Sequence, residues 1–264
     1  MSPEPDPAEL PDHLRRLADS AGQPWAGRSF EPNGAADDDG AADPALLAAL
    51  DGFRAGTARP EHVVEAFRRA RLLIPLLAHA GDVGVAPSGH AVDKTQELSI
   101  VTVAGPDGRK VLPAFTSVAT LAAWNPLARP VPAAGPRIAL AAASEETQLI
   151  VIDPAGSGEF VLRRPAVFAL GTDAPWLPAY RDPAVRAAFE ASVAEEPEVR
   201  GIELASGDPR YRLRAEELVV RLRLLPGLDR DGLQRLVARI TERWAASPVI
   251  VNGVDSMALR LEQG

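Results

Sequence analysis

Apolar residues recur every three or four positions in seven segments of the chain, which predicts seven helices. Most of these segments begin with a serine or aspartate that can cap a helix, or with a proline in the first turn. They begin at or near Pro44, Pro60, Val118, Pro136, Pro165, Pro183 and Arg230.

Short apolar runs bounded by turn residues predict strands between these helices. Pro106-Asp107-Gly108 indicates a hairpin, and the turn at 153–156 indicates a second one. Residues 79–90 are Gly-rich and predict a loop. The predicted strands and extended segments cover 70–78, 97–105, 109–116, 147–162, 198–206, 216–225, 247–255 and 257–262.

The order of elements predicts an α+β fold with two domains. Residues 44–171 form a mixed sheet with flanking helices, and residues 184–264 form a small β-β-α-β domain. The Pro-rich stretch 172–183 is the predicted linker. Residues 1–43 are rich in Pro, Gly, Ala and Asp, and we expect a disordered leader there.

Charge is distributed unevenly along the chain. The net charge is −8 over 264 residues, and residues 1–43 hold ten acidic residues against three arginines. The remainder is therefore close to neutral, which disfavours a dedicated nucleic-acid-binding protein.

The residue types exclude several chemistries. Cysteine is absent, so disulfides, thiol catalysis and cysteine-ligated zinc are excluded. The four histidines form no HxxxH or HExxH pair, and we expect no metal and no cofactor. The chain starts without a signal-peptide pattern and has no long uncharged apolar run, so we expect a cytoplasmic protein.

Thr116 and Ser117 are adjacent hydroxyl residues between a predicted strand and a predicted helix. No GxSxG pattern surrounds a serine, and no histidine follows position 90. The favoured interpretation is architectural: Ser117 caps the helix, and Val118, Leu121 and Trp124 form its apolar stripe.

Two groups of charged residues are candidate binding sites. Asp93, Lys94 and Glu97 surround the start of a strand, and a lysine among carboxylates can serve a ligand or acid–base chemistry. A surface ion pair is the competing interpretation. Arg221 and Arg223 alternate with apolar residues on a predicted strand, so they form its polar face.

The C-terminal arginines form two separate sets. Glu203, on the neighbouring strand, is the predicted partner of Arg221 or Arg223. Arg235, Arg239 and Arg243 follow one line of the last predicted helix, where we expect them to remain solvated. Because the two sets lie on opposite sides, they do not form one basic strip that could follow a phosphate backbone.

The stretch "ELSIVTVAGPDGRKVLPAFTSVATLAAWNP", followed by "LIVIDPAGSGEFVLRR", resembles the N-terminal domain of the SseB family, the enhanced-serine-sensitivity proteins. The whole chain resembles the actinobacterial branch of that family. The resemblance implies an α/β domain followed by a second small domain. It implies no established enzymatic activity and no catalytic residues, and Phe115, Thr116, Ser117 and Trp124 match the family pattern.

Three functional hypotheses follow. The first is a non-enzymatic cytoplasmic protein that binds another macromolecule, a protein partner, with Trp124, Arg221 and Arg223 as candidate contact residues. The second is a small-ligand sensor or enzyme with a polar site near Asp93, Lys94 and Glu97. The third, nucleic-acid binding by the C-terminal arginines, is the least favoured.

Overall fold

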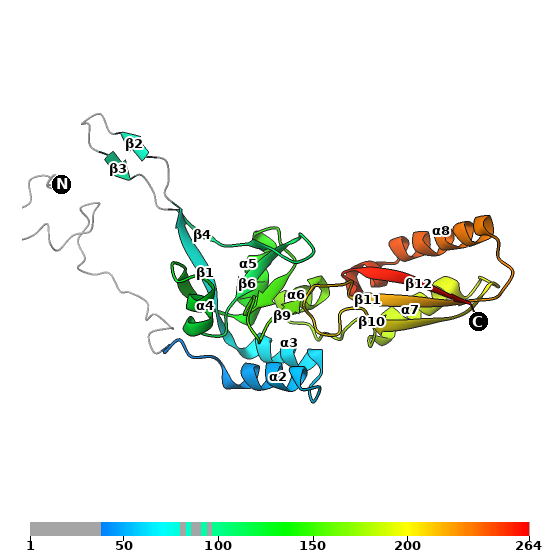
Figure 1. The fold of residues 1–264 in the computed structure, drawn as a ribbon, viewed down its shortest axis with the longest axis horizontal. Coiled ribbons are helices and arrows are strands. Elements are labelled where there is room, and N and C mark those ends of the chain that lie inside the picture. Colours follow the sequence, from blue (N-terminus) through cyan, green and yellow to red (C-terminus); the bar gives the residue numbers. More distant parts are fainter. Residues whose placement is uncertain (1–37, 80–82, 86–90, 94–96, 264) are drawn as a thin grey trace, which may run out of the picture. The chain divides into compact units, whose positions relative to one another are not determined.

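The computed structural model describes residues 38–79, 83–85, 91–93 and 97–263 (Figure 1). The predicted leader lies outside these residues, apart from 38–43. In the described part of the chain, no helix combines the length and apolarity needed to cross a membrane.

Helices before residue 172 begin where the sequence predicts them. Asp43 accepts hydrogen bonds from two N–H groups of the first turn of α2, and proline opens α2, α3 and α6. The bounds are α2 (Pro44–Arg54), α3 (Pro60–Arg69), α4 (Val118–Trp124), α5 (Gly135–Ser144) and α6 (Arg164–Gly171).

Among the described residues of the same part, the strands form three sheets. The first has the antiparallel order β4-β1-β7, the second is the pair β2-β3, and the third is mixed, with the order β5-β6-β8-β9 and a parallel β6-β8 pair. The bounds are β1 (Arg71–His79), β2 (Val83–Val85), β3 (Ala91–Asp93), β4 (Glu97–Ile100), β5 (Val103–Ala104), β6 (Lys110–Ala114), β7 (Arg129–Ala134), β8 (Ile150–Ile152) and β9 (Phe160–Leu162).

Three strand predictions need correction. The run 97–105 is not one hairpin arm, because β4 pairs with β1 and only the short β5 pairs with β6. Residues 83–85, within the predicted loop, form β2. The strand β7 was not predicted because Pro130 and Pro132 interrupt it; prolines are tolerated there since β7 lies at the edge of its sheet.

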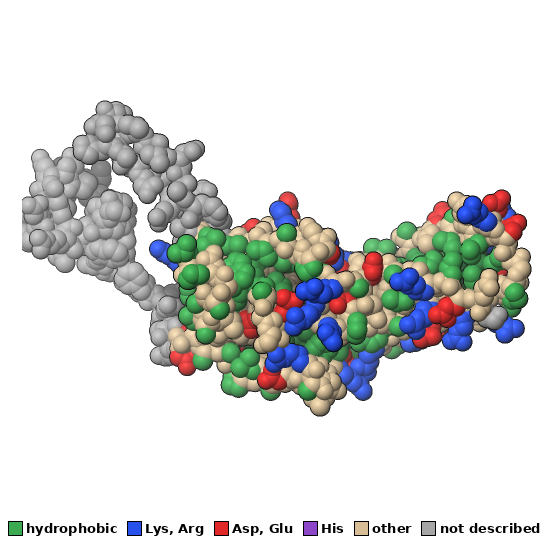
Figure 2. Space-filling view, viewed as in Figure 1, with side chains coloured by type: hydrophobic (Ala, Val, Ile, Leu, Met, Phe, Trp, Pro, Cys, Tyr) green, Lys and Arg blue, Asp and Glu red, His purple; other side chains and the backbone are tan. Residues whose placement is uncertain are grey.

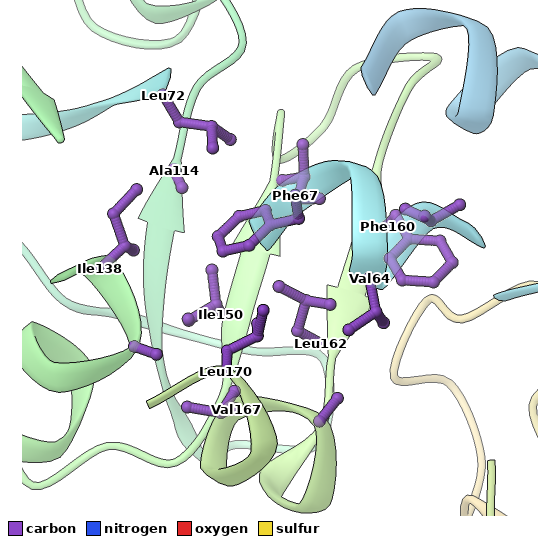
Figure 3. Packing of buried hydrophobic residues seen from close by; sticks show 14 of the residues in the cluster. Val64, Phe67, Leu72, Ala114, Ile138, Ile150, Phe160, Leu162, Val167 and Leu170 are labelled. Atoms are coloured by element: carbon purple, nitrogen blue, oxygen red, sulfur yellow. The ribbon is translucent and has the colours of Figure 1, made fainter. Parts of the chain in front are cut away.

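The largest hydrophobic cluster of this part lies between helices and strands. Side chains from α3, α5 and α6 point toward those of β6, β8 and β9 (Figure 3). Phe67, Ile138 and Ile150 are fully buried there. This packing fixes the positions of the end of α2 and of the strand β9. Both elements contribute to the candidate site described below.

The C-terminal part confirms the predicted β-β-α-β order. Its sheet has the order β10-β11-β12, antiparallel then parallel, and α8 runs alongside it (Figure 1). The bounds are α7 (Pro183–Val193), β10 (Val199–Ser206), β11 (Leu218–Leu224), α8 (Arg230–Ala246), α9 (Pro248–Gly253) and β12 (Met257–Gln263). These elements and those above establish an α+β fold.

The segment 247–255 was predicted to be extended, and this is wrong. Ser247 caps the short helix α9, Pro248 occupies its first turn, and Ile250 is buried. Leu218, Val220, Leu222 and Leu224 are buried as predicted, and they share a cluster with Leu236, Ile240 and Trp244 of α8.

Ser117 caps α4, as the sequence predicts. Its hydroxyl oxygen accepts a hydrogen bond from the Thr120 N–H at 3.1 Å, while the Thr116 hydroxyl donates to the buried carboxylate of Asp153 at 2.7 Å. Leu121 is buried, but Val118 is 42% exposed because the first residue of the helix lies outside the packed face. Both hydroxyl groups have architectural partners.

Replacing Ser117 with alanine should therefore lower the free energy of unfolding by about 0.5–2 kcal/mol, because the Thr120 N–H loses its acceptor. Urea denaturation of the variant and the wild type measures this difference. Covalent labelling of Ser117 by a fluorophosphonate probe would instead indicate a nucleophile and would contradict the architectural role.

Candidate functional site: an arginine-lined groove

The connection between β10 and β11, 207–217, presents three arginines at alternate positions, and we name its residues 207–216 the arginine loop. Tyr211 and Leu213 are buried between these arginines. Both buried residues have positive φ, 52° and 55°, which is uncommon for residues other than glycine. Such backbone conformations persist only when the surrounding structure holds them, and they concentrate at functional sites.

The base of the arginine loop is closed by backbone contacts. The Gly207 N–H donates to the Glu217 carbonyl at 2.9 Å, and a Cβ on Gly207 would lie 2.2 Å from the Glu216 carbonyl oxygen. Only glycine permits this approach. The loop also docks on β9, because the Val161 N–H donates to the Tyr211 carbonyl at 2.7 Å.

An aromatic cluster anchors the middle of the loop. The Tyr211 ring stacks on Phe160 with centroids 4.9 Å apart, and Phe53 meets both rings edge-on. Burial raises the pKa of Tyr211 above its ordinary range, so the phenol stays protonated. The loop is thereby fixed to α2 and β9.

A groove of about 910 Å³ lies between the arginine loop, the end of α2 and the turn before β9. Gly56 and Gly158 keep parts of its wall free of side chains. Its charged and aromatic lining includes Phe53, Arg54, Glu159, Arg210, Arg212 and Arg214.

Two of these arginines converge on one carbonyl oxygen. Arg54 donates to Ser157 O at 2.9 Å and Arg212 donates to the same oxygen at 3.3 Å. Arg54 also pairs with Asp51, and Arg212 lies 3.8 Å from Glu159. Two guanidinium groups are therefore held close together with partial compensation of their charge.

Arg210 and Arg214 are exposed, and no hydrogen bond or ion pair joins either side chain to another residue in the described part of the chain. Figure 2 shows Lys and Arg side chains gathered on this face of the molecule. Arginine presents a planar fork of donors that matches carboxylate and phosphate oxygens. The groove is thus suited to an anionic ligand.

Behind the loop lies a buried ionic cluster. Arg163, 2% exposed in its side chain, pairs with Asp208 at 2.7 Å and Asp255 at 3.2 Å, and Arg109 donates twice to Asp255 at 2.9 and 3.0 Å. Burial alone would raise the pKa of Asp255, but Arg109 and Arg163 hold it below its ordinary value. This carboxylate therefore stays ionised.

Glu217 adjoins the ionic cluster without a basic partner of its own. One carboxylate oxygen accepts the Asp255 N–H at 2.6 Å, and the other is buried with no hydrogen-bond partner among the described residues. Burial raises the pKa of Glu217 to about 7. This carboxyl group therefore titrates near neutral pH.

Of the candidates predicted from the sequence, Trp124, Arg221 and Arg223 are described in full, and they do not line this groove. Lys94, and the side chains of Asp93 and Glu97, lie outside the described residues, so a site there stays a prediction. Trp124 is half-buried against Phe115, with ring centroids 5.2 Å apart, and its contact is with the core.

Glu203 lies opposite Arg221 and pairs with it at 3.1 Å, as predicted, and it also pairs with Arg223 on the diagonal at 3.6 Å. Arg221 also lies 3.8 Å from Glu262. This face of the sheet is therefore largely compensated, unlike the groove.

The three helical arginines remain largely exposed, as expected, but two of them have a partner that was not predicted. Arg239 and Arg243 lie 2.5 and 2.7 Å from the buried carboxylate of Glu196. Their hydrogen bonds hold the pKa of Glu196 below its ordinary value, against the opposing effect of burial. The pairs join α8 to the end of α7.

The candidate residues predicted from the sequence do not include Arg54, Arg210, Arg212 or Arg214. The available signal was the alternation in "RYRLR", where each buried apolar residue separates two arginines. Arg54 enters the site only through tertiary structure. No group of three or more potential metal ligands occurs within the described ranges.

Comparison with known proteins gives one likeness. No curated protein and no solved structure is significantly similar to the chain. The family model of the SseB protein N-terminal domain matches residues 45–169, which include α2, β9 and the 153–158 turn but end before the arginine loop. Residues 45–169 thus carry the likeness to the SseB family that the sequence motifs predict.

Proposed function

We propose that this chain is a non-enzymatic member of the SseB family whose arginine-lined groove binds an acidic segment of a protein partner. The observation that carries the proposal is the pair Arg210 and Arg214, which are exposed and have no ionic partner among the described residues, at a groove whose walls are fixed. The order of the motifs and the Ala-, Arg- and Pro-rich composition support the actinobacterial branch. The cysteine-free composition supports a cytoplasmic location.

The chemistry of the groove favours a peptide carboxylate as the ligand. Guanidinium groups bind carboxylates through two parallel hydrogen bonds, and Phe53 adds an apolar contact beside them. A ligand with acidic and apolar side chains satisfies both parts of the lining.

A nucleic-acid ligand fits the groove less well. Glu159 lies among the arginines of the lining, so the positive surface is short and interrupted, whereas a phosphate backbone needs a continuous one. The next arginines along the chain, Arg221 and Arg223, are already paired with Glu203. The positive charge is therefore local rather than a long strip.

Reversing the two unpaired charges, Arg210→Glu with Arg214→Glu, should weaken binding of a fluorescein-labelled poly-glutamate peptide about tenfold or more. Each lost ion pair contributes about 0.2–1 kcal/mol, and each new glutamate adds repulsion. Fluorescence anisotropy at low ionic strength measures the dissociation constant. Circular dichroism verifies that the variant is folded.

The matched control is Arg221→Glu with Arg223→Glu, which changes the net charge equally on the compensated sheet face. We expect this control to stay folded and to keep most of the peptide affinity. Equal weakening in both double variants would contradict the proposed site. Tighter binding of a single-stranded oligonucleotide than of the peptide, lost in the groove variant and falling steeply with salt, would indicate the wrong class of partner.

A further inference from the structure

We infer that Arg163 is the positioning residue of the groove: it fixes the arginine loop in its binding conformation without touching the ligand. The inference rests on the proposed function of the groove. Arg163 belongs to the corner between β9 and α6, and its side chain is almost completely buried behind the loop.

Arg163 holds both ends of the loop with one nitrogen. Its Nη2 donates to the Asp208 carboxylate at 2.7 Å and to the Ala215 carbonyl at 2.6 Å. These two acceptors flank the three arginines of the loop. One guanidinium group therefore sets the distance between the two ends of the segment that presents the positive charges.

Asp208, the partner of Arg163, also binds the middle of the arginine loop. The carboxylate oxygen that binds Arg163 also accepts the Leu213 N–H at 2.7 Å, and the Asp208 carbonyl accepts the Tyr211 N–H at 2.9 Å. Leu213 and Tyr211 are the two residues with positive φ. The strained part of the loop is thus held by hydrogen bonds to Asp208, whose buried charge Arg163 compensates.

The other guanidinium nitrogen binds the segment that precedes β12. Nη1 donates to the carboxylate of Asp255 and to the hydroxyl of Ser256, both at 3.2 Å. Arg109 supplies the second positive charge that Asp255 needs. Arg163 therefore cannot swing away from the loop without leaving a buried carboxylate less compensated.

These contacts would increase affinity because they hold the arginine loop in its binding conformation before the ligand binds. The loop carries three like charges, and the converging guanidinium groups of Arg54 and Arg212 repel each other in the absence of a ligand. A loop held in the bound conformation does not lose further conformational entropy when the ligand binds. Weakening the contacts between Arg163 and Asp208 should therefore lower the affinity of the groove for the peptide.

The test variant is Arg163→Lys, which keeps the charge but lacks the forked donors that bind both ends of the loop. We expect it to fold, to bind the poly-glutamate peptide about tenfold more weakly, and to be cleaved faster by trypsin after Arg210, Arg212 and Arg214. Mass spectrometry of the fragments identifies the cleavage sites. A merely structural role would lower the melting temperature without localised cleavage in this loop.

The matched control is Arg239→Lys, because Arg239 makes a 2.5 Å ion pair with the buried Glu196 and neither residue lines the groove. The control should keep both the affinity and the trypsin resistance. Asp208→Asn is the second variant if Arg163→Lys fails to fold, and the same two changes are expected from it. Unchanged affinity together with an uncleaved loop in a folded variant would overturn the inference.

The two proposals fail in distinguishable ways. If Arg210→Glu with Arg214→Glu leaves peptide binding intact, the proposed function fails, while trypsin cleavage of the Arg163 variant still reports on the contacts between Arg163 and the arginine loop. If the charge reversal abolishes binding but Arg163→Lys binds and resists trypsin like the wild type, only the positioning role fails.

Discussion

Replacing Phe160 with alanine should lower the free energy of unfolding by about 3–5 kcal/mol. The ring is 1% exposed, packs in the largest cluster of the N-terminal part, and stacks on Tyr211 of the arginine loop. Its removal leaves a cavity beneath the loop and takes away the main partner of the Tyr211 ring. Urea denaturation of the folded variant measures the loss.

The matched control is Phe168→Ala, which removes the same ring from the surface. Phe168 is 70% exposed on α6, so we expect a change of at most about 0.5 kcal/mol. Similar losses for both variants would contradict the packing described for Phe160.

Replacing Glu217 with glutamine should remove a pH-dependent loss of stability near neutral pH. Burial raises the pKa of Glu217 to about 7, so the folded protein holds this proton more tightly than the unfolded chain. The stabilisation is complete below the unfolded pKa and is lost as pH rises through about 7. Between about pH 5.5 and pH 8.5 the loss is about 2 kcal/mol.

The measurement is the free energy of unfolding at both pH values for the wild type and Glu217→Gln. Asp255 and Glu196 have lowered pKa values and stay ionised throughout this window, so they contribute little to the slope. The difference between the two proteins should change by about 2 kcal/mol from the lower to the higher pH. A constant difference would show that Glu217 is ionised in the folded protein at both values.

Local signals in the sequence were sufficient for most helices and for the C-terminal sheet. Asp43, Ser117 and Asp229 cap helices where their side chains predict it, because a cap depends only on neighbouring residues. The alternation around Arg221 correctly separated the buried face of β11 from the polar one. The helix α9 was missed because its six residues are too short to show a helical period.

The candidate groove depends on contacts that no local pattern reveals. Arg54 and Arg212 are 158 positions apart and meet only at Ser157 O. Arg163 is an unremarkable residue beside a helix start in the sequence, and its role appears only once Asp208 and Asp255 are placed around it. Helical spacing likewise could not reveal that Glu196 is the partner of two arginines of α8.

The most direct test of the central claim is the position at which an acidic ligand binds. A poly-glutamate peptide carrying a photoreactive group is cross-linked to the wild-type protein, and mass spectrometry identifies the modified residues. We expect cross-links in 50–56, 156–160 and 207–215, the segments that line the groove, and their loss in Arg210→Glu with Arg214→Glu. Cross-links on the sheet face around Arg221 and Arg223, or cross-links that persist unchanged in the groove variant, would contradict the account.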